Sequence, residues 1–236
     1  MGITDRQESI LDTVIGEYIN TAQPVSSLLL ENKYDFGICP ASLRIEMYKL
    51  TEKGYLCQPH TSAGRAPTDK GYRFFVDKLL KKGFFEKDYN FKTENLIREE
   101  IKDTVKFIQS LTKSLAEFSS NLALGYLFNE KILWKEGWED ILQEPEFKET
   151  KLISNFANLL KSFEEEISDF KINSEVRVYI GKENPFPKAK DFSIIISKCH
   201  FPNREEGILA ILGPKRMTYE KNIGSLNYLT KLLEEL

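Results

Sequence analysis

Hydrophobic residues recur at helical intervals near the start of the chain. They form one apolar face over about four turns, made up of Ile10, Leu11, Val14, Ile15, Tyr18 and Ile19. Thr4 and Gln7 have the spacing of a capping box, which opens a helix, and Pro24 cannot continue one. The pattern therefore predicts a first helix that begins after Thr4 and ends before Pro24.

Two further helices are predicted before residue 54. Ser26 suits the cap of a short helix that reaches about Lys33. Pro40 suits the first turn of the next helix, and Gly54 suits its end. The core face of this third helix consists of Leu43, Met47 and Leu50. Its opposite face, with the flanking positions, consists of Ala41, Ser42, Arg44, Ile45, Tyr48 and Lys49. An exposed isoleucine and tyrosine on so short a helix indicate a contact surface.

A small hairpin and a fourth helix are predicted next. Residues 55–59 suit one strand and 65–67 the other, joined by a small polar stretch with Gly64 at its tip. Thr68 suits the cap of a helix whose apolar side is Tyr72, Phe75, Val76, Leu79 and Leu80. Three helices, a hairpin and a closing helix are typical of a winged helix-turn-helix. This fold presents one helix to the major groove of DNA, while the hairpin reaches the neighbouring backbone or minor groove.

The remainder of the chain alternates between helical and strand patterns. Residues 83–93 have no clear period and are interpreted as a linker between a domain over 1–82 and another over 94–236. A long helix is expected over 94–124, ending at Gly125, with an apolar stripe that suits either a seam between two helices or packing on its own sheet. Helices are also expected over 137–143, 149–168 and 219–236, and strands near 131–134, 174–181, 192–199 and 207–212.

Charge is distributed unevenly along the chain. The 236 residues have a formal net charge of −3, which by itself argues against a partner that is a nucleic acid. Residues 44–82, however, hold nine basic and four acidic side chains, whereas the stretches on either side are both net acidic. This concentration of positive charge on the predicted third helix and hairpin favours DNA binding.

Composition excludes several other classes of protein. Hydrophobic residues make up 41% of the chain, as in an average soluble protein, and no apolar run approaches the roughly 20 residues that span a bilayer. No signal peptide is recognisable, so we expect a cytoplasmic protein with no membrane contact. The few cysteines and histidines lack metal-ligand spacing, so we expect no metal and no cofactor; they are Cys39, Cys57, Cys199, His60 and His200. The glutamate runs at 164–166 and 234–235 are interpreted as solvated helix faces, and no enzyme is expected.

Several motifs resemble one family. In the first half they are Asp5-Arg6-Gln7, Leu43-Arg44-x-Glu46-Met47, and the nearly continuous run Gln58-Pro59-His60-Thr61-Ser62-Ala63-Gly64-Arg65 with Pro67-Thr68-Asp69-Lys70-Gly71-Tyr72-Arg73. In the second half they are Pro145-Glu146-Phe147, Val178-Tyr179-Ile180-Gly181 and Leu212-Gly213-Pro214-x-Arg216-Met217. Together they resemble the heat-inducible transcription repressor HrcA. The resemblance implies an α+β fold, with a winged helix-turn-helix followed by a GAF-like domain, an antiparallel sheet flanked by helices.

The same resemblance implies a function and partners. It implies a repressor of chaperone genes that binds double-stranded DNA at an inverted-repeat operator as a homodimer. It also implies dependence on the chaperonin GroEL and release of repression on heat stress. The main alternative is a winged-helix repressor that senses a small molecule through its C-terminal domain. A winged helix that binds a protein is a further alternative, which the basic segment and the 58–73 run disfavour.

The chain departs from the family pattern at three places. Few residues join Gly125 to Lys131, where relatives have an inserted dimerisation domain and extra strands. We therefore expect a reduced sheet, with the 94–124 helix or the last helix making the dimer contact instead. Ile45 stands where an asparagine is common, so the operator preference is expected to differ. Cys39-Pro40 replaces a serine-rich helix start, which predicts a weaker cap.

The residues expected to contact DNA lie on the third helix, the hairpin and the start of the fourth helix. They are Ser42, Arg44, Ile45, Tyr48, Lys49, His60, Thr61, Ser62, Gly64, Arg65, Lys70 and Arg73. Arg44 suits a guanine or a phosphate, and the alternative is a surface arginine paired with Glu46. The hairpin tip suits phosphate contacts, and the alternative is a plain tight turn. Lys70 and Arg73 are either phosphate contacts or solvated charges, and His60 suits a backbone or phosphate role better than catalysis.

Overall fold

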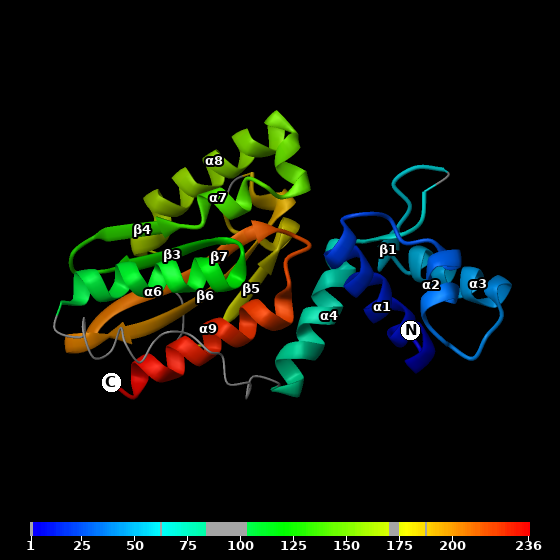
Figure 1. The fold of residues 1–236 in the computed structure, drawn as a ribbon, viewed down its shortest axis with the longest axis horizontal. Coiled ribbons are helices and arrows are strands. Elements are labelled where there is room, and N and C mark those ends of the chain that lie inside the picture. Colours follow the sequence, from blue (N-terminus) through cyan, green and yellow to red (C-terminus); the bar gives the residue numbers. More distant parts are fainter. Residues whose placement is uncertain (1, 62, 84–102, 170–174, 187) are drawn as a thin grey trace. The chain divides into compact units, whose positions relative to one another are not determined.

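The computed structural model describes residues 2–61, 63–83, 103–169, 175–186 and 188–236. The chain divides into two compact units, Met1–Lys82 and Gly83–Leu236, each with its own elements (Figure 1). All but the first residue of the predicted linker, and the beginning of the predicted 94–124 helix, lie outside the described residues. Within the described ranges no helix is both long and apolar enough to cross a membrane.

The described residues of the N-terminal unit form four helices and a two-stranded hairpin. In chain order these are α1 (Asp5–Thr21), α2 (Ser27–Lys33), α3 (Pro40–Glu52), β1 (Leu56–Cys57), β2 (Ala66–Pro67) and α4 (Asp69–Lys82). The predicted caps are confirmed: Thr4 and Gln7 form a reciprocal capping box on α1. The Ser26 hydroxyl accepts a hydrogen bond from the Leu29 backbone N–H at 3.1 Å, and that of Thr68 accepts one from Gly71.

One hydrophobic core holds the helices of this unit together. Its members come from all four helices and from β1, and each is nearly or fully buried: Ile10, Leu11, Val14, Ile15, Leu30, Leu43, Met47, Leu50, Leu56, Tyr72 and Val76. Ion pairs at the edge of the core also connect α4 to α1, because Lys78 of α4 contacts both Glu8 and Asp12 of α1. Leu80, predicted on the apolar side of α4, is 37% exposed, whereas the neighbouring Leu79 is buried.

The C-terminal unit is built on a five-stranded antiparallel sheet in the order β4-β3-β7-β6-β5. The strands are β3 (Leu122–Leu127), β4 (Ile132–Glu136), β5 (Arg177–Ile180), β6 (Phe192–Phe201) and β7 (Glu205–Pro214). The long central pair β6–β7 is in register from Phe192↔Pro214 to Phe201↔Glu205. Its hairpin strands are longer than the sequence pattern predicted.

Helices cover both faces of this sheet (Figure 1). In the described ranges of this unit the α-helices are α6 (Thr104–Ser119), α7 (Trp138–Ile141), α8 (Thr150–Glu166) and α9 (Tyr219–Glu234). On one face, residues of α7 and α8 join Leu124, Tyr126 and Ile194 in a large apolar cluster. On the other face α6 packs on β3, and α9 packs on β6. The α+β prediction, with helices flanking an antiparallel sheet, is therefore confirmed.

The predicted end of the long helix at Gly125 is wrong. Helix α6 ends at Ser119, because Ser120 adopts a left-handed conformation with φ 53°, and Leu122 begins a strand. Gly125 lies within that strand beneath α6. A Cβ added there would stand 2.3 Å from the Thr112 hydroxyl oxygen, so the glycine permits a close helix–sheet approach rather than a helix end.

The apolar stripe of α6 packs against the sheet of the same chain. Ile108, Leu111 and Leu115 are at most 1% exposed, packed on the protein's own sheet. The predicted apolar positions of α9 are buried in the same way, apart from the half-buried Leu232. These buried side chains already belong to the core and are not available for a seam with a second copy. Which surface makes the dimer contact stays a prediction.

Candidate nucleic-acid interface

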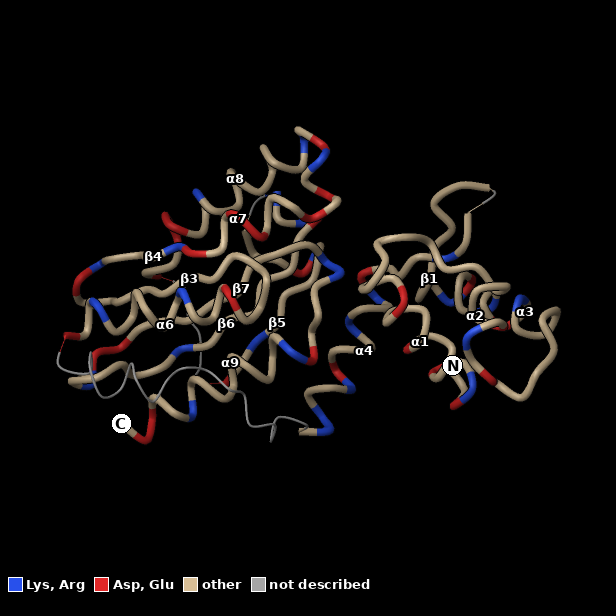
Figure 2. Tube along the Cα trace, viewed as in Figure 1, with Lys and Arg blue, Asp and Glu red and all other residues tan. Residues whose placement is uncertain are grey.

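The outer face of α3 carries large exposed side chains. Ile45 is 54% exposed and Tyr48 55% exposed, although Leu43, Met47 and Leu50 on the opposite side are buried. Arg44 is also exposed, and Figure 2 shows further basic positions on α3 and α4. The helix therefore has the two faces that its sequence predicted, one in the core and one toward solvent.

The start of α3 is weakly capped, as the cysteine at this position predicted. Cys39 is the N-cap residue and makes no side-chain hydrogen bond to the helix backbone. Its sulfur instead lies 3.3 Å from the Ser42 hydroxyl oxygen. This hydrogen bond lowers the pKa of the Cys39 thiol. Ser42 thus faces the helix start rather than projecting freely from the outer surface.

The wing, defined here as residues 56–67, is anchored at its base to the turn before α2. The backbone N–H of Val25 donates to the carbonyl of Arg65, and that of Arg65 donates to Val25, both at 2.8 Å. Gly64 makes this approach feasible, since an added Cβ would lie 2.4 Å from the Val25 carbonyl carbon. The need for glycine here is therefore explained within the protein, by backbone packing rather than by DNA.

Gln58 shapes the tip of the wing, a role that was not predicted from the sequence. Its side-chain amide donates to the carbonyl oxygens of Thr61 at 2.8 Å and of Ala63 at 3.0 Å. The backbone N–H of Ala63 also donates to the carbonyl of the exposed His60 at 2.9 Å. Ser62 lies outside the described residues. Gln58 belongs to the motif run that carries the family resemblance, which was the one available signal.

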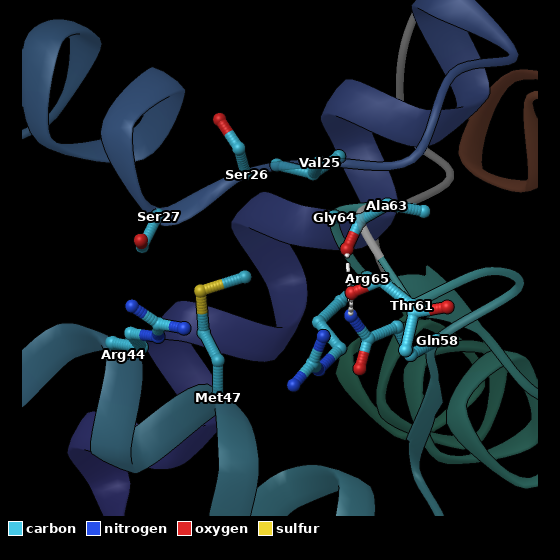
Figure 3. Close-up of a pocket in the computed structure, with 10 residues that line it drawn as sticks. All are labelled: Val25, Ser26, Ser27, Arg44, Met47, Gln58, Thr61, Ala63, Gly64 and Arg65. Atoms are coloured by element: carbon cyan, nitrogen blue, oxygen red, sulfur yellow. Dashed lines mark hydrogen bonds between the residues drawn. The ribbon is translucent and has the colours of Figure 1, made fainter.

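A cleft of about 380 Å³ lies between the start of α2, the side of α3 and the wing (Figure 3). We call it the Arg44–Arg65 cleft. It is lined by Val25, Ser26, Ser27, Arg44, Met47, Gln58, Thr61, Ala63, Gly64 and Arg65. The guanidinium groups of Arg44 and Arg65 stand on either side of the Met47 side chain in this view. The lining contains no acidic residue.

Three other basic candidates already have partners within the protein. Lys49 pairs with Glu46 at 2.7 Å, and hydrogen bonds from Lys49 and Gln7 lower the pKa of Glu46. Glu46 is therefore engaged by Lys49, whereas no described residue pairs with Arg44. Arg73 pairs with Asp77 at 3.3 Å.

Lys70 is engaged by the end of α3. Its ammonium donates to the Lys53 carbonyl at 2.7 Å and lies 4.3 Å from the centre of the Tyr55 ring. A cation beside the C-terminal carbonyls of a helix is favourable for the helix. This lysine is thus a structural contact in the free protein. In the described part of the chain, no group of three or more His, Cys, Asp or Glu side chains could hold a metal ion.

A core of three helices, a closing helix and a small hairpin beside an exposed helix face define a winged helix-turn-helix, the class to which many transcription regulators belong. The particular family follows from comparison with known proteins. The family model described as HrcA protein C terminal domain matches residues 71–223. The chain therefore belongs to the HrcA family.

Curated relatives align over the full length of the chain. The heat-inducible transcription repressor HrcA of Thermoanaerobacter sp. (strain X514) is 29% identical, with 100% of this chain and 97% of the relative covered. The repressor of the same description from Clostridium botulinum (strain Eklund 17B / Type B) is 27% identical, with 100% and 98% covered. These relatives are transcription repressors and not enzymes, in agreement with our prediction.

The chain is a short member of this family. The alignment with the Thermoanaerobacter relative spans 335 positions, although the chain has only 236 residues. The relative therefore contains many residues that have no counterpart here. A solved structure described as a hypothetical protein at 2.2 Å resolution shares the fold, with a TM-score of 0.78, 19% identity, and 99% of this chain and 98% of that one covered.

Proposed function

We propose that this chain represses heat-shock genes by binding an inverted-repeat operator as a homodimer. In this proposal α3 of each copy enters the major groove and the wing lies along the adjacent backbone, so that the two-fold symmetry of the protein matches that of the DNA. The observation that carries it is the outer face of α3, where Arg44, Ile45 and Tyr48 are exposed within the basic segment of the chain.

Base reading is assigned in this proposal to the exposed side chains of α3. Ile45 offers only apolar surface, so it suits the methyl group of a thymine rather than a hydrogen-bonding base edge. Tyr48 lies one turn further along the same face and offers both a ring and a hydroxyl. The operator preference is therefore expected to differ from that of relatives with an asparagine at position 45.

The regulatory part of the proposal rests on family membership. We propose that the chaperonin GroEL maintains the repressor in its DNA-binding form and that heat stress diverts the chaperonin, which releases repression. Repression of a reporter gene in cells would be measured with normal and depleted chaperonin. Unchanged repression after depletion would contradict this part and leave DNA binding unaffected.

DNA binding itself is tested by fluorescence anisotropy on duplexes from the regions upstream of the chaperone genes in the organism that encodes this chain. Specific binding to one inverted repeat should exceed binding to a scrambled duplex by about 10³-fold or more, and should weaken steeply as salt increases. Light scattering of the complex should give two chains per duplex. Equal affinity for the operator and the scrambled duplex would contradict the proposal.

A further inference from the structure

We propose that the Arg44–Arg65 cleft is a phosphate site, which holds one phosphate of the DNA backbone between the two guanidinium groups. This inference rests on the proposed function and assigns a specific task to one part of it. It makes Arg44 a residue for the DNA backbone rather than for a guanine base. Reading of the sequence is then left to the neighbouring face of α3 around Ile45 and Tyr48.

The lining of the cleft has the chemistry of an anion site. It contains two arginines, the hydroxyl residues Ser27 and Thr61, and Ser26, whose hydroxyl already accepts a hydrogen bond from the Leu29 backbone N–H, and it contains no carboxylate. Arg44 has no ion pair or hydrogen bond to any described residue. Arg65 donates its Nε–H to Thr51 at 3.0 Å, and its two terminal nitrogens have no partner in the described ranges. Two positive groups thus face one cleft without compensation, which favours an anion with several acceptor oxygens.

The position of Arg44 on α3 places it at the edge of the base-reading face, next to the cleft. Successive residues of a helix are turned by about 100°, so Arg44 lies to one side of Ile45, about 100° around the helix, and about 40° from Tyr48. That side is the one where the cleft lies, because Arg44 lines it together with residues of the turn before α2 and of the wing (Figure 3). A guanidinium that grips a phosphate in this cleft is not available for the two parallel hydrogen bonds that recognise guanine.

The protein fixes the second arginine before any ligand arrives. The Arg65 backbone is held by two hydrogen bonds to Val25, and its side chain is held by Thr51 of α3. Arg65 therefore loses little conformational entropy on binding, and this favours affinity. The Gln58 side chain donates hydrogen bonds to the carbonyl oxygens of Thr61 and Ala63. Without these bonds the partial negative charge of the two oxygens would repel an anion.

The test compares the salt dependence of variants of the full-length chain. Arg44→Ala should weaken binding to operator and scrambled duplex by the same factor and reduce the slope of log K against log salt by about 1, as expected for one lost phosphate contact. Arg44→Lys should retain the slope. Arg204→Ala, which removes an exposed arginine from the C-terminal unit, is the matched control and should change neither quantity.

A chemical probe identifies the phosphate. Operator duplexes with one uncharged methylphosphonate linkage at each position in turn should include one that weakens binding of the parent chain and has no effect on Arg44→Ala. The absence of any such position overturns the inference, as does a variant that loses preference at one base pair with an unchanged salt slope.

Binding of inorganic phosphate tests the cleft independently of the proposed DNA binding. If millimolar phosphate raises the melting temperature of the parent but not of Arg44→Ala, and no methylphosphonate position is found, the cleft serves a free phosphate compound and the backbone assignment is wrong. If the parent binds no duplex specifically, the proposed function fails, and the phosphate melting experiment still shows whether the cleft binds an anion.

Discussion

Glu17 is a nearly buried carboxylate that connects α1 to the end of α2. It accepts hydrogen bonds from the Tyr34 hydroxyl at 2.6 Å and from the Lys33 ammonium at 2.9 Å, and its side chain is only 6% exposed. These bonds lower the pKa of Glu17, and the same contact raises the pKa of Tyr34. The ionised form is thus favoured in the folded state.

Acid should therefore weaken the fold in part through Glu17. Because the folded pKa lies below the ordinary value, the stabilisation is fully present above that ordinary value of 4.5 and is lost as the pH falls below it, through the folded pKa. Glu17→Gln should lower the urea midpoint at neutral pH and reduce its dependence on pH in this window. An acid limb identical to that of the parent would show that Glu17 is not responsible.

Ile45 offers a test of base reading at a single residue. Ile45→Asn introduces the hydrogen-bonding group common in the family and should move the preference at one base pair of the operator from thymine toward adenine, by about 1–3 kcal/mol. The salt slope should stay the same, because no phosphate contact changes. Binding to a set of single-base operator variants measures this. Unchanged preferences across the set would remove Ile45 from the base-reading face.

At the scale of the elements, α6 and β3 approach each other closely at Gly125. The Cβ of Gly125→Ala would meet both the Thr112 hydroxyl and the Ile108 side chain, at 2.3 and 2.9 Å. Both neighbours are buried, so helix and sheet must shift, and the variant should be destabilised by about 1–3 kcal/mol. Urea unfolding measures the loss.

A matched substitution in open space separates crowding from the glycine-to-alanine change itself. Gly16 lies inside α1 with nothing within 4 Å of an added Cβ. Gly16→Ala should therefore stabilise the protein by about 0.5–1 kcal/mol through helix propensity. Equal effects at the two glycines would contradict the close packing described for Gly125.

Elements with explicit end signals could be predicted from the sequence, and those without could not. Thr4, Ser26, Pro40 and Thr68 mark the helix starts of the N-terminal unit, because side-chain caps and proline are local features. The end of α6 lacked such a signal, since a serine rather than a glycine adopts the left-handed conformation. Leu122 also continues the helical spacing, so a strand residue was assigned to the helix.

The candidate site was predictable only in part, for a related reason. The outer face of α3 follows from helical periodicity, and its exposed residues were expected. The Arg44–Arg65 cleft depends on long-range pairing of Val25 with Arg65, which no local pattern reports. The partners of Lys49 and Lys70 likewise became apparent only when side-chain positions were known.

At the scale of the whole molecule, we propose different roles for the two units, DNA binding for the first and the dimer contact for the second. Each has a hydrophobic core of its own, so a fragment over 1–82 should fold alone and unfold cooperatively. If the second unit provides the dimer contact, this fragment should bind a half-site much more weakly than the full chain binds the operator. Calorimetry and anisotropy measure the two properties. A fragment that binds as tightly as the full chain would contradict that role for the second unit.

Because Val25 and Arg65 are joined by reciprocal hydrogen bonds, exchange of their two amide protons reports on the attachment of the wing. Exchange of these protons with solvent requires the wing to separate from the turn before α2, whereas exchange in the middle of α1 requires the core to open. Hydrogen–deuterium exchange during stepwise warming would thus distinguish local release of the wing from global unfolding. Faster amide exchange at residues 25 and 65 alone would mean that the proposed phosphate site comes apart at a lower temperature than the fold.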